Sequence, residues 1–237
     1  LPLLVQNEAG YQNLTKLLSA AYLDVEAGDW AHVKAEKLFA HAEGLIALTG
    51  GPGGVINQLL LDGQRDAAEA ALKRLAAAFP SRLYVELQRH GLAEERATED
   101  ALLDMAYANK LPIVATNDVH FGKANMYEAH DALLCIADGQ FVSQDDRRRL
   151  TREHRFKTAT EMQAQFADLP EALENTIEIA RRCAFKPGKR KPILPVFVPE
   201  SGKSAEAELK AQAEEGLARR ISGAKLAAER SVYDERL

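Results

Sequence analysis

Cysteine is scarce in this sequence, and long apolar runs are missing. The 237 residues include two cysteines, Cys135 and Cys183, far apart in apolar stretches with helical spacing. Thiols so few and so widely separated exclude a disulfide-rich secreted scaffold. No apolar run approaches the roughly 18 residues of a membrane span, and no signal peptide is visible. These absences predict a cytoplasmic protein with free, buried thiols, the alternative being one structural disulfide.

The sequence also lacks an excess of positive charge. It has 30 basic and 35 acidic residues, a net charge of −5, so nothing at the scale of the whole chain indicates a nucleic-acid binder. Any such contact must come from a local basic cluster. Residues 145–157 mix both signs, which predicts either a solvated face or an ion-pair network.

A second cluster, residues 181–191, contains basic residues and no acid. Its six cations are Arg181, Arg182, Lys186, Lys189, Arg190 and Lys191. A helix C-terminus favours cations, which accounts for Arg181 and Arg182 without a ligand. The others lie on a loop rich in Pro and Gly, and we hypothesise that they contact phosphate groups.

Common catalytic motifs are absent as well. The sequence contains no phosphate-binding Gly-x-x-x-x-Gly-Lys-Ser/Thr loop and no Gly-x-Ser-x-Gly nucleophile turn. The Gly-rich stretch GGPGG at 50–54 fits a tight turn. The alternative is a loop whose amides approach a phosphate. The candidate residues must therefore be sought from the predicted fold.

Apolar periodicity predicts alternating strands and helices over about the first 140 residues. Short apolar runs bounded by turn residues predict strands at 44–50, 82–88 and 111–118, and residues 1–7 resemble the end of another strand. Apolar residues at helical spacing predict helices at 8–23, 66–79, 94–110 and 125–139. This alternation predicts parallel βα units, arranged as a doubly wound sheet or a barrel.

Beyond residue 140 the pattern changes to helices, predicted at 160–169 and 170–183. Residues 185–203 hold four of the nine prolines and are predicted to form an extended linker at a domain boundary. A last helix is predicted at 204–222. We therefore expect two parts, residues 1–185 and residues 186–237.

Polar residues at the ends of the predicted strands form the candidate site, because sites in parallel βα folds collect there. Asp118 and His120 are positions i and i+2 of an extended segment, so their side chains would point the same way. A carboxylate and an imidazole suit Zn, Mn or Fe, but a metal site needs three or more protein ligands. The alternative is an Asp that caps the next helix and a surface His.

Glu86 and His90 are the other candidates at a strand end. They would form a second polar pair at the same rim, or Arg89 would neutralise Glu86 in a structural ion pair, which is the interpretation we prefer. The remaining histidines are predicted to be structural, His130 as a hydrogen-bonded helix residue and His32, His41 and His154 as surface residues.

Seven stretches, taken in order, resemble consecutive blocks of the alpha subunits of bacterial DNA polymerase III. They are NEAGYQNLTKLLSAAYL, HAEGLIALTGGPGG, LYVELQRHGL, LPIVATNDVHF, EAHDALLCIADG, FADLPEALENTIEIARRC and KPILPVF. The blocks match the polymerase-and-histidinol-phosphatase (PHP) domain of that family and cover nearly the whole chain. Seven blocks in the right order are much more specific than any one of them.

The resemblance implies an α/β fold that is part of a larger one. The PHP domain is a distorted barrel of seven parallel βα units, of which residues 1–185 would be the C-terminal portion. Residues 186–237, with ILPVF at the place of the family's LPxF segment, would be the linker and the start of the polymerase palm region. The chain would begin just after N-terminal segments that carry most metal ligands, including an H-x-H motif.

The resemblance also implies a metal site. The PHP cleft of the family holds up to three divalent metals, and its D-x-H ligand pair matches Asp118 and His120. A Cys that supplies a ligand in metal-binding relatives aligns with Gly51, which implies an incomplete site. Zn²⁺ or Mn²⁺ would be the ion there. Relatives with an intact site use it for 3′–5′ exonuclease or phosphoesterase chemistry, and in others the domain is a scaffold.

For the full-length protein, the resemblance implies a DNA-directed DNA polymerase, the nucleotidyltransferase of chromosome replication. Its Mg²⁺-binding palm would lie outside this chain, and its partners would be DNA, a proofreading exonuclease subunit and the sliding clamp. Two alternatives stay open. One is a free-standing PHP metal-dependent phosphoesterase, which has no need of the tail KPILPVFVPESGK. The other is a non-catalytic binding module within the polymerase, which Gly51 favours.

Overall fold

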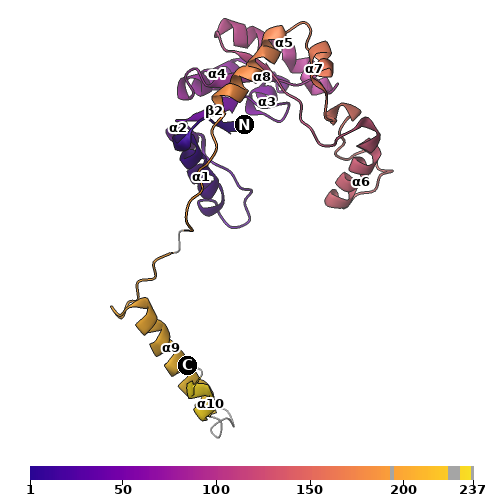
Figure 1. Cartoon of the computed structure of the whole chain (residues 1–237). Coiled ribbons are helices and arrows are strands. Elements are labelled where there is room, and N and C mark those ends of the chain that lie inside the picture. Colours follow the sequence, from indigo (N-terminus) through magenta and orange to yellow (C-terminus); the bar gives the residue numbers. More distant parts are fainter. Residues whose placement is uncertain (193–194, 224–229, 236–237) are drawn as a thin grey trace. The chain divides into compact units, whose positions relative to one another are not determined.

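The structure is a computed structural model that describes residues 1–192, 195–223 and 230–235. The expected second part, 186–237, and its ILPVF motif therefore fall partly outside the described residues. The chain divides into two compact units, Leu1–Pro187 and Gly188–Leu237, and each is described by itself (Figure 1).

A four-stranded sheet lies at the centre of the first unit. Its strands are β1 (Leu3–Val5), β2 (Leu45–Leu48), β3 (Leu83–Leu87) and β4 (Ile113–Ala115), in the spatial order β1-β2-β3-β4. The last three are parallel, as predicted, whereas β1 runs antiparallel to β2. The sequence pattern does not predict this reversal, because the alternation of side chains along a strand is the same in either direction.

The sheet is buried on both faces, and successive strand residues alternate between two cores. Ala47 and Val85 belong to the larger core, to which several helices contribute. Their neighbours Ile46 and Tyr84 belong to the smaller core, which Ile179 completes. Burial on both faces explains why these strands appear in the sequence as continuous apolar runs.

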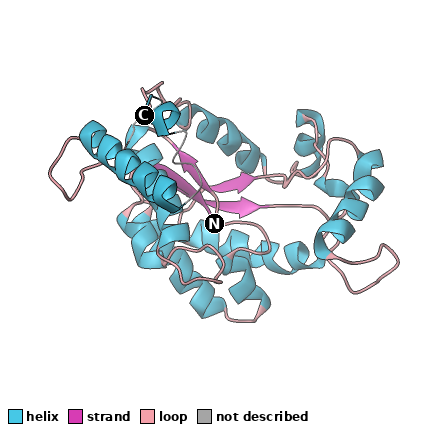
Figure 2. Ribbon diagram, turned by 90° about the horizontal axis from the view of Figure 1, so that it is seen from below, coloured by secondary structure: helices cyan, strands magenta, loops and turns pink. Residues whose placement is uncertain are grey.

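Helices follow the strands, and Figure 2 shows the strands enclosed among them. The helices of the first unit are α1 (Glu8–Leu23), α2 (Ala35–Ala40), α3 (Val55–Leu61), α4 (Arg65–Ala78), α5 (Ala93–Ala108), α6 (Tyr127–Asp138), α7 (Ala159–Gln165) and α8 (Pro170–Arg182), with short 3-10 helices η1 (Ala124–Met126) and η2 (Arg152–His154). The second unit contains α9 (Ala205–Gly223) and α10 (Arg230–Glu235). None of the described helices is long and apolar enough to cross a membrane.

The predicted helices agree with these bounds to within about two residues, except that α7 ends earlier than expected. The sequence does not predict α2, which is too short to show a helical period, or α3, which directly follows the turn-forming glycines of GGPGG. Cys135 is buried on α6, Cys183 is half-buried after α8, and both thiols are free, as predicted.

α1 packs so closely on the chain before β2 that only glycine fits at the contact. A Cβ on Gly10 would lie 1.9 Å from the carbonyl oxygen of Gly44, which itself has φ +71°. Asn7 caps the helix, its side-chain oxygen accepting a hydrogen bond from the Gly10 amide at 3.0 Å. The cap and the two glycines thus fix where α1 meets the sheet.

Candidate functional site

Asp118 and His120 lie directly after β4, at the carboxyl end of the parallel strands. Their side chains meet, with Oδ2 of Asp118 3.1 Å from Nε2 of His120, and are 56% and 37% exposed. The two side chains therefore do point the same way. Among the described residues, however, no group of three or more His, Cys, Asp or Glu side chains is arranged to hold a metal ion.

The His120 ring belongs to a cluster of four of the six histidines. Its centre lies 5.6 Å from that of His130 and 5.8 Å from that of His154. His154 stacks on His90, with ring centres 4.0 Å apart. The prediction of a surface position for His154 is wrong, because the residue is 3% exposed. Its charged neighbours in η2 stay in solvent while the imidazole turns inward.

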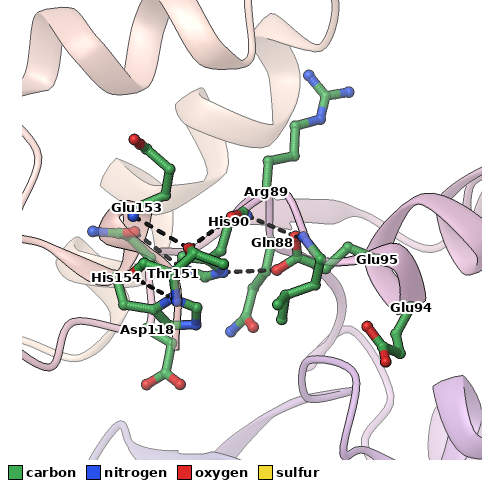
Figure 3. A network of polar contacts seen from close by, with 12 residues as sticks. Gln88, Arg89, His90, Glu94, Glu95, Asp118, Thr151, Glu153 and His154 are labelled. Carbon is green, nitrogen blue, oxygen red and sulfur yellow. Dashed lines mark hydrogen bonds and ion pairs between the residues drawn. The ribbon is translucent and has the colours of Figure 1, made fainter. Parts of the chain in front are cut away.

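Burial and neighbouring groups lower the pKa of the His154 ring and hold the ring in place. Burial lowers the pKa of His154 to about 4, and repulsion from His90 adds to that effect. The backbone N–H of Thr151 donates to Nδ1 of His154 at 3.1 Å, and the Thr151 hydroxyl donates to the His90 carbonyl oxygen at 2.8 Å (Figure 3). These contacts attach η2 to the end of β3.

His90 is held at both ring nitrogens. Nδ1 lies 2.7 Å from Oε1 of Glu95, and Nε2 lies 3.1 Å from Oδ1 of Asn117. That amide oxygen also accepts from Nζ of Lys157 at 3.0 Å, while the Asn117 amide nitrogen donates to the Arg155 carbonyl oxygen at 2.8 Å. These contacts hold the His90 ring in one orientation between α5 and the chain after β4.

Glu95 is the carboxylate that holds His90 from the other side. Its Oε2 accepts from the backbone N–H groups of His90 at 2.6 Å and of Leu92 at 3.1 Å. Burial acts to raise the pKa of Glu95, but the hydrogen bonds from His90 and Leu92 outweigh it and lower the pKa. Glu95 thus stays an anion in a buried position.

Glu86 has partners other than His90 and Arg89, the two that the sequence suggested. It is 5% exposed, and its carboxylate accepts from the Gly50 amide at 3.0 Å, the Thr116 hydroxyl at 2.5 Å and the Gln88 side-chain amide at 3.2 Å. The alternative of a Glu86–His90 pair therefore does not hold. Glu86 instead joins the ends of β2, β3 and β4.

Arg89 does not neutralise Glu86 either. Its guanidinium lies 2.5 Å from Glu99 and 2.7 Å from Asp168, and its carbon lies 4.6 Å from the centre of the Phe166 ring. Hydrogen bonds to Asp168 and then to Glu99 raise the pKa of Arg89. The preferred interpretation, an ion pair between Arg89 and Glu86, is therefore wrong, and Arg89 instead ties the end of β3 to α5 and to the turn after α7.

A side chain at Gly51, where the resemblance implies a lost ligand, would have to displace the end of the Gln88 side chain. A Cβ at this position would lie 2.1 Å from Oε1 of Gln88, whose amide is already bound to Glu86. The Gly54 amide donates to the Gly51 carbonyl oxygen at 2.7 Å, which closes the Gly-rich stretch as a turn. The turn interpretation of GGPGG therefore describes this loop.

The polar network at the strand ends is complete without a ligand. No buried side-chain nitrogen or oxygen of the described residues lacks a hydrogen-bond partner. A metal bound through Asp118 and His120 would need further ligands. The described residues therefore do not by themselves fit a metal centre.

Comparisons with known proteins agree on one family. Residues 1–90 match the PHP domain family. The whole chain is 52% identical over 237 residues to a DNA polymerase III subunit alpha of Caulobacter vibrioides, and it covers 21% of that protein. Over 244 aligned residues it is 36% identical to the subunit of Pseudomonas aeruginosa and 37% identical to that of Vibrio cholerae, again covering all of this chain and 21% of each relative.

The chain thus spans about a fifth of the length of the curated relatives it matches. Its similarity to them extends from end to end, and the PHP match covers β1 to the end of β3. The chain is therefore similar along its whole length to one segment of the DNA polymerase III alpha subunits, a segment that includes part of a PHP domain.

Proposed function

We propose that the full-length protein is the DNA-directed DNA polymerase of bacterial chromosome replication, and that this chain supports it without carrying the polymerase active site. The observation that carries the proposal is the 52% identity over the entire chain to a DNA polymerase III subunit alpha. A free-standing phosphoesterase is not favoured, because the matched relatives are about five times as long as this chain.

Primer extension by the intact protein tests this proposal. We expect template-directed incorporation of deoxynucleotides that requires Mg²⁺, because nucleotidyl transfer depends on metal ions that stabilise the developing charge. Intact, folded protein that fails to extend a primer under these conditions would contradict it.

DNA, the proofreading exonuclease subunit and the sliding clamp are the proposed partners, and the cytoplasm is the proposed location.

The proposed domain organisation assigns residues 1–185 to the C-terminal portion of a PHP barrel and residues 186–237 to the linker and the start of the palm region. Two observations support it. The chain divides between Pro187 and Gly188, and both cores take their residues from the chain up to Cys183. The four strands would be part of a seven-stranded barrel whose other strands are not among the described residues.

Asp118 and His120 are proposed to occupy the D-x-H ligand position of a PHP metal site that is degenerate in this protein. Their 3.1 Å contact supports a shared position, and the side chain of Gln88 in the space beside Gly51 supports the loss of a ligand there. The PHP domain would then act mainly as a scaffold.

Elemental analysis of the intact protein, purified without chelator, tests the degenerate site. We expect Zn and Mn well below one equivalent, and the same content in the Asp118→Ala/His120→Ala variant. Near-stoichiometric metal that this variant loses would show an intact centre and would overturn the scaffold proposal.

A further inference from the structure

The two basic clusters of the sequence differ in what their cations contact. In the first cluster, residues 145–157, the prediction of an ion-pair network is confirmed. The pairs are Arg147–Asp131, Arg148–Asp138, Arg149–Asp145, Arg152–Glu128, Arg155–Glu161 and Lys157–Glu153. Each of these charges is matched within the protein, which leaves little net positive potential for an external anion.

In the second cluster, Arg182 has a structural role. It donates to the Tyr84 hydroxyl and to the Ser81 carbonyl oxygen, both at 2.8 Å. Its place at the end of α8 agrees with the preference of a helix C-terminus for cations.

The three lysines of the second cluster are placed differently. Lys186, Lys189 and Lys191 are exposed, and they make no ion pair with any residue that the structure describes. They lie on a stretch, 184–192, that is neither helix nor strand. No acidic residue occurs between Glu178 and Glu200, so no nearby carboxylate along the chain can neutralise them.

The spacing of these lysines suits a polyanion. An extended chain advances at most about 3.3–3.6 Å per residue, so Lys186 and Lys191 lie up to roughly 18 Å apart. A DNA duplex presents one phosphate charge per about 1.7 Å of its axis, so several phosphates fall within that reach. Lysine contacts such groups as a point charge, without demanding one geometry.

We propose that Lys186, Lys189 and Lys191 bind the phosphate backbone of duplex DNA. The proposal rests on the proposed function, since it assigns a DNA-binding role to this segment of the polymerase. Backbone binding of this kind carries no base information, so it would hold DNA of any sequence. Its contribution would appear as salt dependence, because each lysine that neutralises a phosphate releases condensed counterions.

The test measures binding of the intact protein to a primer–template duplex over a range of salt concentrations. The Lys186→Gln/Lys189→Gln/Lys191→Gln variant should lower the magnitude of the slope of log K against log salt by about 0.9 for each phosphate that is no longer neutralised, up to about 2.7. The Lys186→Arg/Lys189→Arg/Lys191→Arg variant keeps the charge and should keep the slope.

A matched control is the Arg148→Gln/Arg149→Gln/Arg152→Gln variant. It removes the same number of charges from the paired cluster, and we expect the slope of the parent protein. If the lysine variant kept the parental slope, or if the control changed it equally, the proposal would be overturned. Primer extension is measured in the same preparations. If the polymerase is active and the slope is unchanged, only the role of the lysines is contradicted, and the proposed function is not.

Discussion

The side chain of Gln88, which is bound to Glu86, occupies the space beside Gly51. Glu86 gathers donors from three strands, and one of these donors, the Gln88 amide, lies where a side chain at Gly51 would be. A substitution there must move an amide that is hydrogen-bonded to a buried carboxylate. The packing at this point thus depends on Gly51 and Gln88, which are far apart in the chain.

Gly51→Ala is expected to destabilise the protein by about 1–3 kcal/mol, because it overpacks this point and breaks the hydrogen bond from Gln88 to Glu86. Gly53→Ala is the control, because nothing lies within 4 Å of a Cβ there. Urea unfolding measures both variants. In a Gln88→Ala background the cost of Gly51→Ala should fall, and a cost that stays the same would contradict the assigned clash.

Arg89→Lys is expected to lower stability by about 2 kcal/mol, because a lysine cannot keep the forked hydrogen bonds of a guanidinium with Glu99 and Asp168. The Arg89 side chain is 21% exposed, so these hydrogen bonds are partly shielded from water. Arg65→Lys is the matched control, since its pair with Asp104 is 55% and 68% exposed, and it should change stability by less than about 0.5 kcal/mol. Equal effects in denaturant unfolding would contradict a special role for Arg89.

The sequence predicts contacts between residue neighbours but not between distant ones. The meeting of Asp118 and His120 follows from their i, i+2 spacing. The burial of His154 depends on His90, which is distant in the chain, and no local pattern signals such a contact. The true partners of Glu86 and Arg89 were missed for the same reason.

At the scale of the elements, the start of α7 is held by a capping box. Thr158 accepts from the Glu161 amide at 3.3 Å, and the Glu161 carboxylate accepts from the Thr158 amide at 2.8 Å. Arg155 donates to the same carboxylate at 2.8 Å. The hydrogen bond from Arg155, followed by those from Thr158, lowers the pKa of Glu161 to about 2.

The capping box predicts a pH dependence for Glu161→Gln. A carboxylate whose pKa is lower in the folded state stabilises fully above its unfolded pKa of 4.5, and that stabilisation is lost as the pH falls through about 2. The variant should therefore be less stable than the parent at pH 7, with a difference that shrinks below pH 4.5. Thermal unfolding at several pH values measures it, and a difference independent of pH would refute the assignment.

The elements themselves were largely predictable. β2, β3 and β4 are buried on both faces, so each is a distinct apolar run, and the longer helices carry a clear apolar period. α3 was missed because it follows GGPGG directly, and glycines signal a turn rather than the start of a helix.

At the scale of the whole molecule, the first unit contains both cores. Every residue of the two cores lies at or before Cys183, so removing the chain after Pro187 should leave the packing of that unit intact. We expect the truncated chain to unfold cooperatively with a midpoint within about 4 °C of the parent, roughly the effect of 1 kcal/mol in a chain of this size. Circular dichroism during heating measures this, and loss of the transition would contradict two separable units.

The order of strands in the sheet has a consequence for how the chain is made. Each strand pairs with the one before it in the sequence, from β1 to β4. During synthesis, every new strand therefore finds its partner already outside the ribosome, and no strand has to wait for one that is translated much later. The edge of the strand added last is covered by the next βα unit, which shortens the period in which that edge can capture another nascent chain.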